Sequence, residues 1–162
     1  MSPSNDLLIA DAGPLIALSR VISLSLLADC FGAVWLTETV LAECTARPDR
    51  PEGMVILAAV KAGWLRVRPD SPSTQNWNLD PGEASAIAAA LHMQARILID
   101  DRAGRRVAHG LGLRVIGALG VLLRAKQLGR LPNVRPLTEQ LVTSGYFLSS
   151  TVIEDGLRVV GE

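Results

Sequence analysis

Two short apolar runs in this sequence each stop at a carboxylate. Leu7–Ala10 is followed by Asp11, and Ile97–Ile99 is followed by Asp100 and Asp101. Short apolar runs bounded by turn or helix signals are typical of the buried central strands of a parallel sheet. In open α/β sheets, ligands bind outside the carboxyl ends of the strands, where these ends share one edge. The two runs therefore predict that Asp11 and Asp101 lie close together at a binding edge.

Strand and helix signals alternate along most of the chain. Beside Leu7–Asp11 and Ile97–Asp100, strands are predicted at Ala33–Leu36, Trp64–Arg68 and Leu113–Ile116. The helices predicted between and after them are Leu15–Ser19, Ile22–Cys30, Glu38–Thr45, Glu52–Ala62, Ala84–Met93, Arg102–His109 and Ala118–Gln127. This alternation predicts a parallel sheet of four or five strands with helices on both faces, a three-layer α/β/α fold.

The length of 162 residues is that of one domain with a good-sized core. We expect residues 1–132 to form this core, and residues 133–162 to form a helical extension packed on the same domain. Within the extension, helical stretches are predicted around Leu137–Ser144 and Thr151–Val160.

Composition narrows the possible partners and compartments. Aromatic residues make up only 4% of the chain, which is too few for the stacking platforms of single-stranded nucleic-acid binders. Cys30 and Cys44 form no CxxC pair, so neither a zinc site nor a disulfide framework is indicated. We expect them to be buried thiols in a reducing compartment. With no basic leader and no apolar run long enough to span a membrane, the expected location is the cytoplasm.

Charge is distributed unevenly although the net charge is zero. Residues 1–95 carry 6 Lys and Arg against 10 Asp and Glu, a net charge of −4. Residues 96–135 carry 9 against 2, a net charge of +7, and residues 136–162 carry 1 against 4, a net charge of −3. A cationic block directly after two carboxylates suits a polyanionic substrate and a divalent metal. The same block of basic residues is also compatible with an Arg-rich helix face that is only solvated.

Two helical acids are candidates to join the strand-end acids, namely Glu43 and Glu83. Carboxylate oxygens are the preferred ligands of Mg²⁺ and Mn²⁺, and several carboxylates at one sheet edge would repel each other without a cation. The chemistry that such a site indicates is phosphodiester hydrolysis, in which the metal activates and orients a water. Structural alternatives exist, because Glu83 fits a capping box with Asp80 and most helical Glu residues are solvated.

The aspartate pair has a structural alternative too. Asp100 or Asp101 could cap the helix that begins at Arg102, but one cap needs only one residue. Asp11 has no obvious capping role, since Gly13 and Pro14 follow it, and an isolated buried charge is costly without a partner.

Other enzyme classes fit the sequence poorly. Gly110 and Gly112 follow a helix rather than the first strand, and no third glycine completes a dinucleotide-binding motif. An aspartyl phosphatase needs a second Asp two positions after Asp11, where Gly13 stands. The sequence also contains no G-x-S-x-G nucleophile elbow.

Five segments together resemble the PIN-domain family. They are Asp11 with Gly13–Leu18 after it, Val40–Glu43, Leu79–Ala84, Ile97–Arg102 and Arg114–Gly120. The resemblance covers nearly the whole chain, including the extension after residue 133. It departs from the family pattern at Ala12-Gly13 and at Ala118, where many members carry a hydroxyl residue.

This resemblance implies a metal-dependent nuclease that acts mainly on RNA, as a homodimer, with Mg²⁺ or Mn²⁺ as cofactor. Many members are toxins of type II toxin–antitoxin pairs, so an antitoxin protein is an expected partner and a membrane is not. By resemblance, the catalytic residues are Asp11, Glu43, Glu83 and Asp101, the metal ligands are Asp11, Asp101 and Asp100, and the phosphate contacts are Arg102, Arg105 and Arg106.

Two other functions remain open at this stage. The first is a catalytically inactive PIN-like module that binds a nucleic acid or a protein partner. The second is a small-molecule phosphohydrolase, which would act on nucleotides but not on polynucleotides. The isolated His92 and His109 are expected at the surface and not as catalytic bases.

Overall fold

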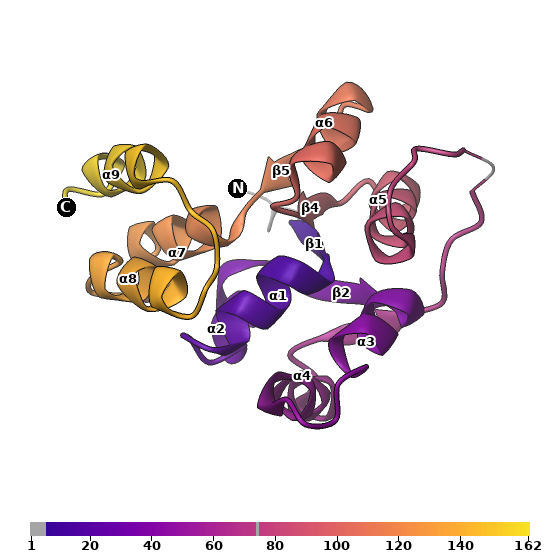
Figure 1. The fold of residues 1–162 in the computed structure, drawn as a ribbon, viewed down its shortest axis with the longest axis horizontal. Coiled ribbons are helices and arrows are strands. Elements are labelled where there is room, and N and C mark those ends of the chain that lie inside the picture. The colour runs from indigo at the N-terminus through magenta and orange to yellow at the C-terminus, as the bar shows by residue number, and fades with distance from the viewer. Residues whose placement is uncertain (1–5, 74) are drawn as a thin grey trace.

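The central sheet has five parallel strands in the order β3-β2-β1-β4-β5 (Figure 1). In this computed structural model, which describes residues 6–73 and 75–162, the strands are β1 (Leu7–Ala10), β2 (Ala33–Thr37), β3 (Arg66–Arg68), β4 (Arg96–Leu98) and β5 (Val115–Ile116). The predicted parallel sheet of four or five strands is therefore confirmed, with five. Residues 1–5 and 74 lie outside the described part of the chain.

The two strands that precede the acids are neighbours at the centre of the sheet. Ile9 of β1 lies opposite Ile97 of β4, and both side chains are fully buried. Beyond the last strand residues, the backbone N–H of Asp11 donates to the carbonyl of Leu98 at 2.9 Å. The predicted strands were too long, since β1 ends at Ala10 and β4 at Leu98, before either acid. This brings the acids just outside the sheet edge.

The helices of the described residues occupy most of the predicted positions. They are α1 (Ala12–Ser19), α2 (Ser25–Cys30), α3 (Glu38–Cys44), α4 (Pro51–Ala62), α5 (Pro81–Met93), α6 (Arg102–Gly110), α7 (Ala118–Gln127), α8 (Arg135–Thr143) and α9 (Ser150–Val159). The helix predicted over Leu15–Ser19 begins earlier, at Ala12, so that Gly13 and Pro14 belong to the first turn of α1. Proline is tolerated there because the first helical N–H groups have no partner within the helix.

Helices cover both faces of the sheet. Helix α5 packs on β1, β2 and β4 and touches α6, while α1, α4 and α7 pack together on the other face (Figure 1). Helices α8 and α9 lie beside α7, at the end of the molecule away from α5. Their Leu141 and Leu157 are fully buried in the same hydrophobic core as the strands.

Side-chain caps fix the helix starts around the carboxyl edge of the sheet. Three caps each accept a hydrogen bond from the third residue of their helix: Thr37 from Val40 at 3.1 Å, Asp80 from Glu83 at 2.8 Å and Asp101 from Gly104 at 2.9 Å. Each such cap stabilises its helix by about 1 kcal/mol. The capped N-termini of α3, α5 and α6 therefore lie together at this edge of the sheet and hold their side chains in fixed positions there. Among the residues that the structure describes, no helix is long and apolar enough to cross a membrane.

Candidate metal centre and active site

A cavity of about 500 Å³ opens at the carboxyl edge of the sheet. We call it the acidic cavity, because six carboxylates line it: Asp11, Glu43, Asp80, Glu83, Asp100 and Asp101. Five of these were predicted site residues, and they come from four different segments of the chain, since Asp100 and Asp101 are adjacent. The sixth, Asp80, was predicted only as a helix cap. The structure thus gathers the predicted acids and adds one to them.

Asp11 is the most deeply placed carboxylate, with 5% of its surface exposed. It occupies the N-cap position of α1, yet its side chain makes no capping hydrogen bond. The reason is local: the third helical residue is Pro14, which has no N–H to donate. Burial, followed by the nearby charges of Asp80, Glu43 and Asp101, raises the pKa of Asp11 to about 7, although a backbone hydrogen bond at Ala12 acts in the opposite direction. The oxygens of Asp11 are therefore desolvated, and within the described residues they serve the fold only through a backbone hydrogen bond at Ala12.

Glu83 is a second buried carboxylate, with 8% of its surface exposed. Its backbone N–H donates to Asp80, but no hydrogen bond from the Asp80 N–H to its side chain occurs among the described residues, so the capping box is only half formed. Burial, followed by the charges of Asp80, Asp101 and Asp11 and a hydrogen bond to Asp101, raises the pKa of Glu83 to about 7. Its carboxyl group faces the other acids and does not serve the helix.

Glu43 reaches the site from α3 and contacts the start of α5. Its Oε1 accepts a hydrogen bond from the backbone N–H of Gly82 at 3.0 Å. A Cβ on residue 82 would lie 2.2 Å from the other carboxylate oxygen of Glu43, so only glycine leaves room for this contact. Partial burial, followed by the charge of Asp80, raises the pKa of Glu43, while the Gly82 hydrogen bond lowers it.

Asp100 differs from the other acids because both of its carboxylate oxygens contact protein groups. Oδ2 accepts from the backbone N–H of Ala118 at 2.9 Å and from the hydroxyl of Tyr146, and Oδ1 lies 3.5 Å from Nη1 of Arg105. A Cβ on residue 117 would lie 2.2 Å from Oδ1, so Gly117 is needed for this arrangement. Asp100 therefore joins the end of β4 to the start of α7 and to the C-terminal segment.

The segment between α8 and α9 supplies a wall of the acidic cavity that the sequence did not predict. Tyr146 and Phe147 both line it. Tyr146 is half-buried, and burial beside the Asp100 carboxylate raises the pKa of its phenol. Phe147 is 88% exposed, which is unusual for a phenylalanine, and it lies directly after the tethered tyrosine.

The three predicted phosphate-contacting arginines of α6 are placed differently from one another. Arg102 lines the acidic cavity. Arg105 is half-buried and donates to the carbonyl of Ile99 at 3.2 Å as well as lying near Asp100. Arg106 is exposed and does not line the cavity. Only Arg102 thus faces the acids with its side chain uncommitted within the described residues.

The donor set fits a hard divalent cation. In residues 6–73 and 75–162, no group of three or more His, Cys, Asp or Glu side chains is arranged so that it could hold a metal ion as it stands. However, Asp11 and Glu83 are desolvated carboxylates whose pKa values rise to about 7, and a bound cation would reverse that shift. An all-oxygen donor set selects Mg²⁺ or Mn²⁺ over zinc.

Comparisons with known proteins found a matching family and a similar solved structure. A family described as "DUF3368: PIN domain" matches residues 7–162. Among solved structures, the chain is similar to a PilT N-terminus domain protein, SSO1118, from the hyperthermophilic archaeon Sulfolobus solfataricus P2. The TM-score is 0.44 and the sequence identity 16%, over 71% of this chain and 89% of that chain. No curated protein matches the sequence.

Proposed function

Because the chain belongs to the PIN-domain family, whose fold is generally that of nucleases, we propose that it is a divalent-metal-dependent ribonuclease. One observation carries the proposal: six carboxylates from separate elements line a single open cavity at the carboxyl edge of a parallel sheet. Such a concentration of like charge is costly for a fold and is explained when a cation balances it.

In this proposal, Asp11, Asp101 and Glu83 hold the metal ion, with Glu43 completing the donor set. When bound, the metal supplies an activated water and offsets charge on the reacting phosphate. Glu83 is buried beside the other acids, so a bound metal ion would balance the charge of its carboxylate. Asp100 is a positioning residue, because its bonds to Ala118 and Tyr146 hold the cavity wall in place.

The substrate contacts in this proposal come from the rim of the cavity. Arg102 is a guanidinium facing the acids, where it suits a phosphate next to the cleaved bond. Phe147 is an exposed ring beside the site, where it suits stacking of one base.

The decisive experiment measures RNA cleavage with Mg²⁺, with Mn²⁺ and with EDTA. We expect cleavage by the wild type with either metal, and none by Asp11→Asn or Asp101→Asn. Asparagine remains a good N-cap, so Asp101→Asn keeps the start of α6 intact. Asp29→Asn removes an exposed carboxylate of α2 and is the matched control. If either site variant cuts RNA at the wild-type rate, the proposal is wrong.

A second candidate is a catalytically inactive module that binds a partner. It is favoured by the commitment of Glu43, Asp80, Asp100 and Asp101 to hydrogen bonds within the protein. Calorimetric titration with Mn²⁺ separates the two candidates. Binding that is lost in Asp11→Asn supports the nuclease, whereas absence of any metal binding supports the inactive module.

The predicted role as a toxin of a toxin–antitoxin pair, and the predicted homodimer, stay predictions. Induced expression in a bacterial host addresses the first. Growth arrest that disappears in Asp11→Asn would support a toxin, and normal growth with an active ribonuclease would contradict it.

A further inference from the structure

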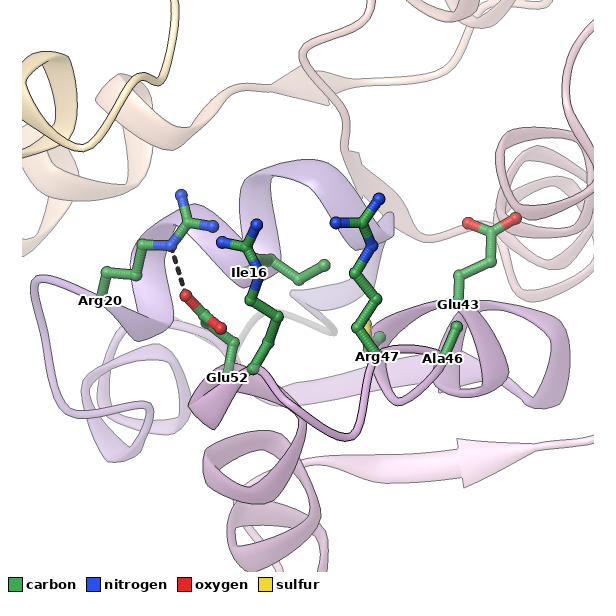
Figure 2. A pocket seen from close by; sticks show the side chains of 8 residues that line it. Ile16, Arg20, Glu43, Ala46, Arg47 and Glu52 are labelled. Atoms are coloured by element: carbon green, nitrogen blue, oxygen red, sulfur yellow. Dashed lines mark hydrogen bonds and ion pairs between the residues drawn. The ribbon is translucent and has the colours of Figure 1, made fainter.

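A second cavity of about 310 Å³ adjoins the acidic cavity, and arginines dominate its charged lining. We call it the arginine cavity. Its charged lining residues are Arg20, Arg47, Arg50, Glu43 and Glu52 (Figure 2). Glu43 lines both cavities, so the two spaces share a wall. Sequence reasoning did not predict this feature, because it lies in the half of the chain with an excess of acids.

The backbone explains why two of these arginines emerge together. The α3–α4 connection makes a turn in which the N–H of Arg50 donates to the carbonyl of Arg47 at 3.1 Å. Pro51 then starts α4, so Arg50 is held at the N-cap position of that helix. Both residues are exposed, and within the described residues neither side chain makes an ion pair or a hydrogen bond. These two guanidinium groups have all their donors available.

Arg20 closes the cavity from the end of α1. Its Nε donates to Oε1 of Glu52 at 2.7 Å, which ties the end of α1 to the first turn of α4. The carboxylate of Glu52 is therefore neutralised by Arg20. Figure 2 shows the guanidinium groups of Arg20 and Arg47 pointing in the same direction as the carboxylate of Glu43, with Arg47 between the other two in this view. The unpaired guanidinium group of Arg47 therefore lies next to the acidic cavity within the described residues.

We propose that the arginine cavity binds backbone phosphates of the RNA substrate, on one side of the bond that the acidic cavity cleaves. This inference rests on the proposed function. A polynucleotide carries one charge at every phosphate, and arginine binds phosphate through two parallel N–H donors. A strand that leaves the acidic cavity past Glu43 meets Arg47 and Arg50 next. The arginines there offset the repulsion that the nearby carboxylates exert on the same strand.

Several observations favour phosphates over an acidic protein segment as the occupant. The cavity shares Glu43 with the proposed cleavage site, so an RNA strand can fill both at once. Five of its eight lining residues are charged and only Ile16, Cys44 and Ala46 are apolar, whereas a peptide-binding groove needs apolar pockets for side chains. An acidic peptide is the rival occupant and appears as an outcome of the test.

The test measures RNA binding without cleavage. In the Asp11→Asn background, the double variant Arg47→Gln/Arg50→Gln is compared with Arg114→Gln/Arg130→Gln, which removes two exposed arginines that line neither cavity. The probe is a fluorescent single-stranded RNA, and anisotropy is followed across a salt series. We expect the cavity variant to bind about tenfold more weakly, and its salt slope to fall by roughly 0.7 for each lost phosphate contact. The control pair should match its parent.

Cleavage kinetics give an independent readout. With Arg47→Gln/Arg50→Gln alone, we expect KM to rise for a long RNA and kcat to stay unchanged. A dinucleotide substrate that cannot reach the second cavity should be cut at the wild-type rate. Thermal unfolding checks that the fold is intact, which is expected because both side chains are exposed.

Failure of this inference differs from failure of the proposed function. Equal weakening by the two double variants would show general charge attraction and overturn the phosphate site. Displacement by an acidic peptide without any effect on RNA binding would also overturn it. If the wild type cuts no RNA but RNA binding depends on Arg47 and Arg50, the phosphate site stands and the nuclease proposal falls.

Discussion

Replacing Asp11 by asparagine should stabilise the metal-free protein. The carboxylate is 5% exposed, and its pKa rises from 3.8 to about 7 because it is desolvated and surrounded by other acids. This rise in the pKa of Asp11 means that, above pH 7, the ionised carboxylate makes the folded state less stable by about 4 kcal/mol, at about 1.36 kcal/mol for each pH unit. The asparagine side chain of the variant is itself buried without full hydrogen bonding, and this destabilisation offsets part of the gain in folding free energy. We therefore expect a net stabilisation of about 2 kcal/mol.

The pH dependence has a definite sign. Between pH 3.8 and about 7, the folded state holds a proton on Asp11 that the unfolded state has released. The free energy of unfolding of the wild type should therefore fall as pH rises through this window, and level off above it. The asparagine variant lacks this proton and should not show this loss. The difference between the two proteins should be small at low pH and largest at pH 8.

The assay is thermal unfolding in EDTA at several pH values. For a chain of this size, 1 kcal/mol corresponds to roughly 2–4 °C in Tm, so the variant should melt roughly 4–8 °C higher at pH 8. Excess Mn²⁺ should reverse the order, because ligand binding stabilises only the protein that retains the site. Asp29→Asn should track the wild type throughout. A variant that melts below the wild type at pH 8 in EDTA would refute the desolvation argument.

Three further variants test the walls of the acidic cavity. Gly82→Ala places a Cβ 2.2 Å from the Glu43 carboxylate, so RNA cleavage should drop at least tenfold. Gly53→Ala on α4 cannot serve as its control, because a Cβ there would lie 3.1 Å from a backbone atom. Tyr146→Phe removes a hydrogen bond to a carboxylate, and denaturant unfolding should show a loss of about 1.5–3 kcal/mol. Phe147→Ala removes an exposed ring, so stability should stay within about 0.5 kcal/mol while RNA affinity falls by about 1–3 kcal/mol in anisotropy titrations. Unchanged affinity would exclude the stacking role.

The strand-end acids could be predicted because one local rule applied to both. An apolar run followed by Asp predicts a sheet edge, and the parallel order of β1 and β4 then makes Asp11 and Asp101 neighbours. The exact strand ends could not be predicted, because Asp11 is at once the residue after a strand and the N-cap of a helix. A pattern of apolar residues does not separate these two states.

The other residues that line the two cavities were not predicted from the sequence, for a different reason. Asp80 had a complete explanation as a helix cap, and nothing in the sequence shows that the same carboxylate also lines a cavity. Tyr146 and Phe147 follow a helix that is remote in sequence, and only the packing of that helix brings them to the site. Arg47 and Arg50 meet Arg20 through tertiary structure, so counting charge along the chain obscured them.

The hydrogen bond between Tyr146 and Asp100 has a consequence for the order in which the protein is made. Every carboxylate of the site precedes residue 102, yet one wall depends on residues 146 and 147. A ribosome working from the N-terminus therefore extrudes all the acids well before the segment that completes their surroundings. A growing chain that has reached only residue 132 therefore still lacks one wall of the site.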